Sequence, residues 1–494
     1  MSRTPIPEKG ERPEQILETM NALKQGDADW HSGRTFSLVY HAGDEHLRLL
    51  KDAYSMFIAE NLLNPMAFKS LKRMEHEVVR MTADMLHAGP EAAGSMSSGG
   101  TESILLAVKT YRDRARRKRP WVRRPELLAP RTIHVAHEKA CKYFGLRLVK
   151  APLDDDFRVN VKALRKRITR NTVMIAASAP QFPHGVIDPI EEIGQLALKH
   201  NLPFHVDACI GGFLLPWMER LGAPLPLWDF RVPGVTSISA DVHKYGYASK
   251  GASTVTYLDM SYMRDQFFIS TDFPGGIYAG PTMAGTRPGG AVAAAWAAMR
   301  YMGQDGYTKM ARETMEVTRR YLAAIEKMDG VKVLGQPHMS LCALASDDPN
   351  VDIYVVGDQL EERGWEVDRQ QKPTCLHVTL TSNHGPVLEQ YLQDLRDSVA
   401  HVRAHPELAS EGKAAMYGMM AKVPMRSMVR MSVLKIMEGM YGPTGEIPDL
   451  SAVGEGENAD PLLKLVDRYG PKALEIWEKV SGLANKVGIG DPNA

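Results

Sequence analysis

Two lysines stand six residues apart in the stretch SADVHKYGYASKGAS, residues 239–253. Lys244 follows a histidine, and Lys250 lies among small residues. A lysine held in a cleft at the end of a strand can lose its charge by desolvation and become an amine nucleophile. The stretch therefore indicates a covalent catalyst, and a solvated loop lysine is the alternative that the same residues allow.

A carboxylate and a glycine pair precede these lysines. Asp207 ends the apolar run PFHVD, where a buried charge needs a partner; a helix cap or a salt bridge would also provide one. Gly99 and Gly100, followed by Thr101, open a helical stretch whose free N–H groups favour a phosphate. The segment matches neither a Walker A loop nor G-x-G-x-x-G, so a capped turn explains it equally well by itself.

These features together match what pyridoxal phosphate requires. A phosphate cradle anchors the cofactor, a lysine holds its aldehyde, and a carboxylate keeps the pyridine nitrogen protonated so that the ring accepts electrons. The sequence therefore predicts pyridoxal phosphate bound by Lys244 and Asp207, and no metal.

The elements that must position these residues alternate along the chain. Alternating strands and helices imply right-handed βαβ units in a mostly parallel sheet, which gathers ligands at the carboxyl ends of its strands. We expect an α/β fold with a smaller C-terminal α+β domain. The predicted strands cover residues 132–136, 172–178, 203–208, 235–240 and 253–258, and helices cover 70–86, 190–200 and 289–303.

The chain divides into four predicted segments. They are an N-terminal arm and helix (1–60), a large cofactor-binding domain (61–305), a small α+β domain (306–444) and a linker with an amphipathic helical tail (445–494).

Composition excludes several classes of protein. Lys plus Arg is 60 and Asp plus Glu is 59, so no basic excess indicates a nucleic-acid partner. The four cysteines form no C-x-x-C pair, which favours a reducing, cytoplasmic setting over a zinc site or a disulfide framework. The polar N-terminus does not resemble a signal peptide, and no apolar run approaches 18 residues, so we expect no transmembrane segment.

Four blocks are long enough to resemble a known family: APQFPHGVIDPI, HVDACIGGF, SISADVHKYGYASKGAS and GGIYAGPTMAGTRPGG. They closely resemble the sphingosine-1-phosphate lyases, which belong with the pyridoxal-phosphate decarboxylases of fold type I. The resemblance runs from about Tyr40 to about Tyr441. It implies a fold type I enzyme that cleaves a carbon–carbon bond.

The resemblance also implies roles for individual residues. Lys244 would be the Schiff-base lysine and Asp207 the partner of the pyridine nitrogen. His134 would stack on the pyridine ring, although His137 lies close by in the same stretch, HVAHEKACKYFG. The cofactor phosphate would meet Gly99, Gly100, Thr101, Ser239 and His243.

Four more positions follow from the same resemblance. Gly285 and Thr286 would reach the cofactor phosphate of a neighbouring subunit, which implies a homodimer with shared active sites. Lys250 would contact the phosphate of a phosphorylated amphiphilic substrate. Tyr40 would be an acid or base near that substrate.

The implied reaction is a retro-aldol cleavage that yields a long-chain aldehyde and phosphoethanolamine. Lys244, Tyr40 and the cofactor phosphate all remain candidates for the base. The segment NLLNPMAFKS (61–70) departs from the family's NPLHPDxFPG, which leaves an amino-acid decarboxylase of the same fold as the alternative. A non-catalytic scaffold is disfavoured because Lys244, Asp207 and the cradle are retained.

Overall fold

A seven-stranded sheet forms the centre of the larger part of the molecule. The structure is a computed structural model that describes residues 5–410, 413–414, 417–418, 426–443 and 445 of the chain. The strand order is β1-β7-β6-β5-β4-β2-β3, and only β7 runs antiparallel to its neighbours in this sheet. The strands are β1 (Ala93–Ser97), β2 (Glu126–Pro130), β3 (Arg147–Ala151), β4 (Thr172–Ser178), β5 (Phe204–Asp207), β6 (Val235–Ala240) and β7 (Ser253–Tyr257).

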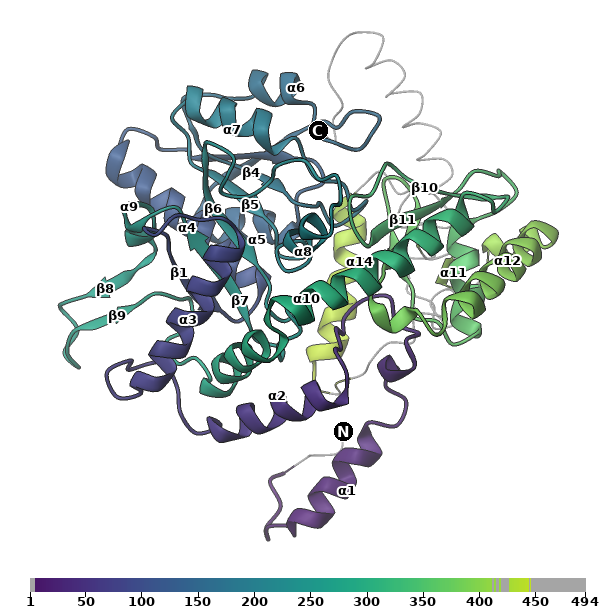
Figure 1. Cartoon of the computed structure of the whole chain (residues 1–494), viewed down its shortest axis with the longest axis horizontal. Coiled ribbons are helices and arrows are strands. Elements are labelled where there is room, and N and C mark those ends of the chain that lie inside the picture. The colour runs from purple at the N-terminus through teal and green to yellow at the C-terminus, as the bar shows by residue number, and fades with distance from the viewer. Residues whose placement is uncertain (1–4, 411–412, 415–416, 419–425, 444, 446–494) are drawn as a thin grey trace.

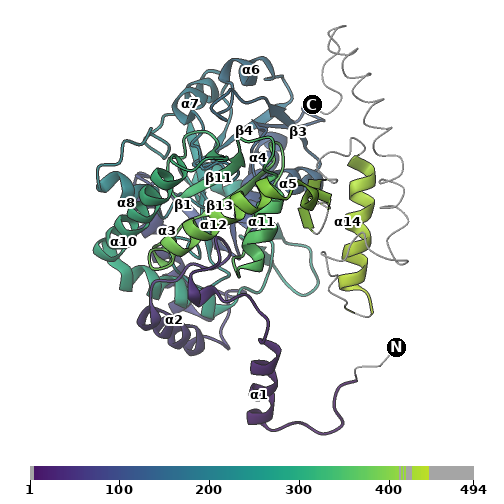
Figure 2. The same ribbon diagram turned by 90° about the vertical axis from the view of Figure 1, so that its right-hand side faces the viewer.

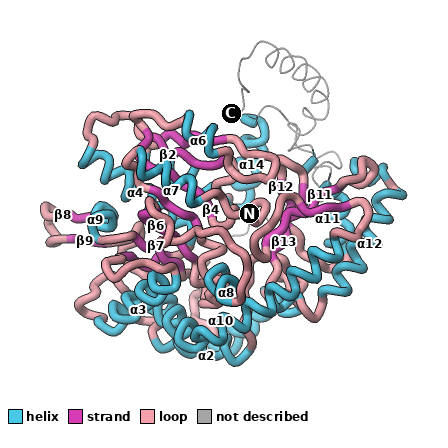
Figure 3. The backbone as a smooth tube through the Cα atoms, turned by 45° about the horizontal axis from the view of Figure 1, so that its top comes forward, coloured by secondary structure: helices cyan, strands magenta, loops and turns pink. Residues whose placement is uncertain are grey.

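Helices cover both faces of this sheet, as its apolar strands require. Leu127 and Ala129 of β2 face one cluster of buried side chains, and Leu128 between them faces the other. The first face is covered by α4 (Gly100–Lys118) and α5 (Val135–Phe144), and the second by α3 (Lys69–Met85), α7 (Ile190–Lys199), α8 (Leu215–Arg220) and α10 (Gly289–Ile325). Figures 1 and 3 show these layers around the sheet.

A second, antiparallel sheet lies beside the first (Figure 1). It has the order β10-β11-β13-β12 and its own buried cluster, to which α11, α12 and the C-terminal part of α10 contribute. The elements are β10 (Val331–Val333), β11 (Leu341–Ser346), α11 (Ile353–Glu362), β12 (Asp368–Gln370), β13 (Cys375–Thr379) and α12 (Leu388–Ala404).

The helix α10 joins the two sheets. It begins before the predicted domain boundary at residue 305 and ends after it, with Gly303 in a non-helical conformation inside it (φ 55°, ψ −176°). The left-handed φ is accessible to glycine at little cost, so the chain bends here without a loop. The four predicted domain ranges remain a prediction.

The remaining elements lie around these two sheets. The helix α1 has no buried residue and stands away from the rest of the chain in Figure 2. The hairpin of β8 (Phe268–Ser270) and β9 (Tyr278–Gly280) projects from the large sheet (Figures 1 and 3). Also described are α1 (Pro13–Leu23), α2 (Asp44–Met56), α6 (Val161–Lys166), α9 (Met260–Met263) and α14 (Arg426–Tyr441).

Most predicted elements are confirmed. Strands 172–178 and 235–240 match β4 and β6 residue for residue, and the helix at 289–303 forms the first part of α10. The strand predicted at 132–136 is wrong, because His134 caps α5 by accepting a hydrogen bond from the Ala136 N–H (3.2 Å), and the strand lies earlier, at Glu126–Pro130.

The amphipathic helix predicted in 445–494 lies outside the described residues, apart from residue 445. Within the described part of the chain, no helix combines the length and apolar character that crossing a bilayer needs.

Candidate active site

A cavity of about 410 Å³ opens at the carboxyl ends of the central strands. Asp207 ends β5, and Lys244 follows β6, its neighbour in the sheet. This is the edge at which open α/β sheets bind ligands. The cavity is lined by Ser98, Gly99, Gly100, Thr101, Glu102, Ile104, His134, Ser178, Pro180, Phe182, Asp207, Cys209, Ile210, Asp241, His243 and Lys244.

The turn between β1 and α4 forms one wall. Its shape is fixed by Glu102, whose carboxylate accepts hydrogen bonds from the N–H (2.7 Å) and the hydroxyl (2.6 Å) of Ser98. The N-terminus of α4 begins at Gly100 and therefore points unpaired N–H groups toward the cavity. Such an end binds phosphate groups.

Gly100 has no room for a side chain. An ideal Cβ there would lie 2.7 Å and 2.8 Å from the two carboxylate oxygens of Asp241 and 2.9 Å from Cys209 Sγ. Of the predicted glycine pair, Gly100 is therefore required by close packing, whereas a Cβ at Gly99 would lie at an ordinary 3.5 Å from the His243 ring.

Asp207 is buried at the base of the cavity and is ionised. One of its oxygens accepts a hydrogen bond from the Cys209 N–H (3.1 Å). Burial acts to raise the pKa of Asp207, but His137 and His134, together with this hydrogen bond, outweigh burial and lower it. A carboxylate in this state stabilises a protonated nitrogen placed beside it.

A chain of buried hydrogen bonds continues from Asp207 across the sheet. The Ser239 hydroxyl lies 3.5 Å from Asp207 Oδ1 and 3.3 Å from His205 Nε2. His205 Nδ1 lies 2.8 Å from the Ser237 hydroxyl, which accepts from the Tyr111 hydroxyl (2.7 Å). Ser239 therefore supports Asp207 from beneath and does not line the cavity, whereas the resemblance implied that it lies near the cofactor phosphate.

The two candidate histidines take different places. His134 lines the cavity, and its Nδ1 accepts from the backbone, which leaves the proton of a neutral ring on Nε2. His137 is fully buried, lies 4.0 Å from Asp207 and does not line the cavity. Burial lowers the pKa of His137 to about 4, so it is neutral at physiological pH. The placement of His134 fits the predicted ring-stacking role.

Lys244 is a charged, ion-paired lysine in this structure. Its Nζ lies 3.0 Å from Asp241 Oδ2. Burial acts to lower the pKa of Lys244, but Asp241, with smaller contributions from Cys209 and Tyr40, raises it above its ordinary value. Desolvation can neutralise a lysine in such a cleft, but in this state Asp241 compensates the charge and Lys244 keeps its proton.

Asp241 is the functional residue that the sequence reading missed. It is 2% exposed, and one of its oxygens has no hydrogen-bond partner among the described residues. It lies three residues before Lys244 and directly after the predicted strand 235–240. A carboxylate at that position could have indicated a partner for the lysine.

His243 lies between the cradle and Asp241. Its Nδ1 is 2.7 Å from the carbonyl oxygen of Ala252, which fixes the ring, and its Nε2 is 3.8 Å from Asp241. Burial lowers the pKa of His243. The ring lies near Gly99 and lines the cavity, in agreement with its predicted place near the cofactor phosphate.

Lys250 and Tyr40 meet beside the cavity, outside its lining. Lys250 Nζ lies 5.4 Å from the centre of the Tyr40 ring and donates to the Leu38 carbonyl oxygen (2.5 Å). Burial and the neighbouring Lys244 lower the pKa of Lys250. Burial raises the pKa of Tyr40 to about 12, so its phenol is protonated at neutral pH.

Gly285 and Thr286 do not line the cavity of their own chain. Thr286 is exposed, and Gly285 lies against the Tyr278 hydroxyl. The altered segment 61–70 lies beside them, because the Leu62 N–H donates to the Arg287 carbonyl oxygen (3.0 Å). The structure therefore groups these two regions outside the lining of the cavity.

The cavity fits pyridoxal phosphate. A buried carboxylate, a lysine amine and a helix N-terminus that tolerates only glycine at its first position all face one space. Asp207 would hold the ring nitrogen, Lys244 the aldehyde carbon, and the turn from Gly99 to Thr101 the phosphate.

Comparisons with known proteins point to the same chemistry. The family model "Pyridoxal-dependent decarboxylase conserved domain" matches residues 2–345. The sphingosine-1-phosphate lyase of Arabidopsis thaliana is 44% identical over 444 residues, covering 88% of this chain and 81% of that protein. A solved sphingosine-1-phosphate lyase from Burkholderia pseudomallei has a TM-score of 0.81 at 36% identity, covering 89% and 97% of the two chains. A glutamate decarboxylase from Lactobacillus brevis, with a TM-score of 0.71 at 20% identity over 82% and 96%, shares the fold.

Proposed function

The chain belongs to the sphingosine-1-phosphate lyase family of pyridoxal-phosphate-dependent enzymes, and we propose that its substrate is a phosphorylated long-chain base such as sphingosine-1-phosphate. The bond between the carbons that carry the hydroxyl and the amine breaks, which releases a long-chain aldehyde and phosphoethanolamine. The observation that carries the proposal is the cavity that brings Lys244, Asp207 and the Gly99–Gly100 turn together, with Lys250 beside it.

The bound cofactor supplies the electron sink for the breaking bond. Asp207 keeps that sink effective because its low pKa maintains a negative charge against the ring nitrogen. Ser239 and the Cys209 N–H hold the carboxylate in one orientation. No change of protonation at Asp207 is needed during turnover.

Lys244 must lose a proton before its Nζ can form a covalent bond. The nearest acceptor is Asp241 Oδ2, 3.0 Å away. Asp241 therefore holds the amine in place, and the ion pair compensates the charge of both buried groups until the proton leaves.

Tyr40 is suited to donate a proton. Its pKa of about 12 keeps the phenol protonated, and it lies near both Lys244 and Lys250. The substrate's hydroxyl proton leaves to a base, and one proton returns to the carbon that the aldehyde has left, so the cleavage needs no water and no redox partner.

Lys250 is the group that selects a phosphorylated substrate. Its ammonium is held by a single backbone carbonyl, and it has no carboxylate within 4 Å among the described residues. A phosphate dianion would replace this carbonyl as the acceptor. The resulting charge-assisted hydrogen bond is about twice as strong as one between neutral groups.

The test is a product assay with matched substrates. Cofactor-loaded protein is incubated with sphingosine-1-phosphate or with sphingosine, and aldehyde and phosphoethanolamine are quantified. We expect the two products in equimolar amounts and a strong preference for the phosphorylated substrate. Lys250→Ala should abolish this preference. The control variant Lys309→Ala, at an exposed lysine, should keep it. Absence of aldehyde with release of carbon dioxide from amino acids would replace the proposal with the decarboxylase.

A second copy of the chain completes the site in this proposal. Gly285 and Thr286 lie away from their own cavity, and the projecting hairpin before them exposes apolar side chains at Phe268, Phe273 and Ile277. Mixing the inactive variants Lys244→Ala and Thr286→Arg under exchange conditions should restore activity, because one site of each mixed dimer is intact. Failure of mixing to restore activity, with exchange verified, would place both residues in one subunit's site.

A reducing, cytoplasmic setting also belongs to this proposal. All four cysteines are buried and unpaired: Cys141, Cys209, Cys342 and Cys375. Proteins of oxidising compartments more often pair their cysteines.

A further inference from the structure

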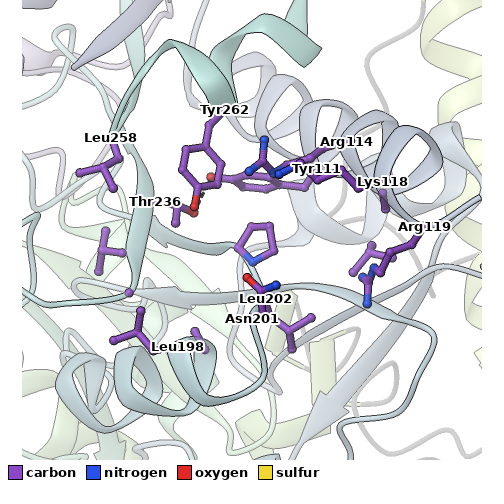
Figure 4. Close-up of a pocket in the computed structure, with 16 residues that line it drawn as sticks. Tyr111, Arg114, Lys118, Arg119, Leu198, Asn201, Leu202, Thr236, Leu258 and Tyr262 are labelled. Carbon is purple, nitrogen blue, oxygen red and sulfur yellow. Dashed lines mark hydrogen bonds between the residues drawn. The ribbon is translucent and has the colours of Figure 1, made fainter. Parts of the chain in front are cut away.

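A second cavity lies at the starts of β4 and β6, whereas Lys244 follows the end of β6. Figure 4 shows the residues that line this cavity. It has a volume of about 440 Å³. Its walls are the C-terminal half of α4, the turn from α7 into β5, and the starts of β4 and β6. The cavity shares no lining residue with the active site.

Three cationic side chains of α4 and its cap line this cavity: Arg114, Lys118 and Arg119. Arg114 is already satisfied, because it donates to the Ser261 carbonyl oxygen (2.6 Å) and stacks on the Tyr262 ring at 4.1 Å. It also lies 3.8 Å from an Asp265 carboxylate oxygen. Arg114 therefore shapes the wall and needs no further partner.

Arg119 is different. It is half-buried, and its guanidinium donates a hydrogen bond to the Thr172 carbonyl oxygen (2.8 Å). No carboxylate lies within 4 Å of Arg119 or of Lys118 in the part of the chain that the structure describes. A guanidinium withdrawn from water without a counter-charge is unfavourable, so this wall is complementary to an anion.

The remaining walls combine apolar side chains with the polar Asn201 and Thr236. Leu198, Leu202 and Leu258 line the cavity together with the ring of Tyr262. Figure 4 shows Asn201 across the space from the cationic wall. An inorganic anion would leave this apolar surface uncovered, whereas a ring or a short chain attached to the anion would bury it.

We propose that this cavity binds a small organic anion, a phosphate monoester or a carboxylate that carries a ring or a short apolar chain. The anionic group meets Arg119 and Lys118, since a guanidinium pairs with either headgroup through two parallel hydrogen bonds. The apolar part lies between Tyr262 and the leucines. This site is additional to the lyase reaction and does not depend on its substrate.

Titration calorimetry on the cofactor-loaded full chain tests the proposal with phenyl phosphate, benzoate and inorganic phosphate as probes. The bound cofactor occupies the phosphate site at Gly99–Thr101. The substitution Lys250→Ala removes the proposed site for the substrate's phosphate, so neither site competes for the probes. We expect saturable binding of phenyl phosphate or benzoate in this variant, with inorganic phosphate at least about tenfold weaker. Whichever organic probe binds more tightly identifies the headgroup.

The variants locate the binding. Arg119→Ala should weaken the organic probe by about tenfold or more, as expected for loss of a charge-assisted pair. Lys118→Ala should weaken it too. Because Lys118 is exposed, this variant remains informative if Arg119→Ala is unstable. Arg116→Ala is the matched control on the same helix, because Arg116 does not line the cavity.

Three results would overturn the proposal. They are the absence of saturable binding by either organic probe, equal affinity for inorganic phosphate, and binding that both Lys118→Ala and Arg119→Ala leave unchanged. Tyr111 is not a suitable test site, because its hydroxyl belongs to the hydrogen-bond chain that ends at Asp207.

Discussion

Replacing Gly100 with alanine should weaken cofactor binding without unfolding the protein. The new Cβ would approach the Asp241 carboxylate to 2.7 Å and Cys209 Sγ to 2.9 Å, both closer than such atoms normally come. Relief requires Asp241 to shift, and the adjacent open space is the cavity of about 410 Å³ that the cofactor needs. The strain therefore becomes a penalty on cofactor binding.

The size of the effect follows from packing energetics. Inserting one methyl into a well-packed site costs about 1–3 kcal/mol. At 1.4 kcal/mol for each factor of ten, cofactor affinity should fall roughly 5- to 150-fold. Alanine is the better helix former, but position 100 is the first residue of α4, so that gain is smaller than the clash.

The assay is an absorbance titration of the apoprotein with pyridoxal phosphate, with thermal melting as the check on folding. Gly89→Ala is the matched control, because a Cβ there meets nothing within 4 Å. Adding Cys209→Ala to Gly100→Ala should restore part of the affinity by removing one of the two contacts. Equal affinity of wild type, Gly89→Ala and Gly100→Ala, or no recovery in the double variant, would refute the reasoning.

Three further predictions follow from the buried charges. Lys244→Ala should remove the borohydride-stable cofactor adduct and destabilise the apoprotein by about 3 kcal/mol, because Asp241 is left unpaired; adding Asp241→Asn should recover stability in urea melts. Asp207→Asn should retain the cofactor but lower kcat by about 10²-fold or more, measured at saturating substrate, since the amide holds no charge against the ring. Burial raises the pKa of Asp188 to about 7 from an ordinary 3.8, so the folded state binds this proton more tightly than the unfolded state. Wild type should therefore lose unfolding free energy relative to Asp188→Asn as pH rises from 4 to 8, and parallel pH curves would contradict this.

The sequence was sufficient for the elements whose pattern is local. The run at 172–178 is apolar on both faces and became β4, with every residue buried. The run at 132–136 has a similar apolar composition, but His134 is the N-cap of α5, so a helix begins there. Periodicity alone does not distinguish a strand from a helix start in so short a run. The strand at 93–97 was not predicted, because AGSMS is short and polar and its partner, β7, is distant in the chain.

The same limit applies to the site. Lys244 and Asp207 were predicted because each residue lies at a strand end within a distinctive motif. The ionic state of Lys244 was not predicted, because it depends on the ion pair that the Asp241 side chain forms with Lys244 Nζ. That side chain packs against Gly100, which is the first residue of α4 and lies far from Asp241 in the chain.

The position of β1 has a consequence for the order of events during synthesis. This strand carries the cradle glycines at its end, yet within the described sheet it is hydrogen-bonded to β7 alone, with Ser97 opposite Ser253. The ribosome releases β1 long before β7 exists, and non-local pairing must wait for its partner. The nascent chain therefore has no complete phosphate cradle until residue 257 has emerged, so the cofactor is captured late, after most of the large sheet has been made.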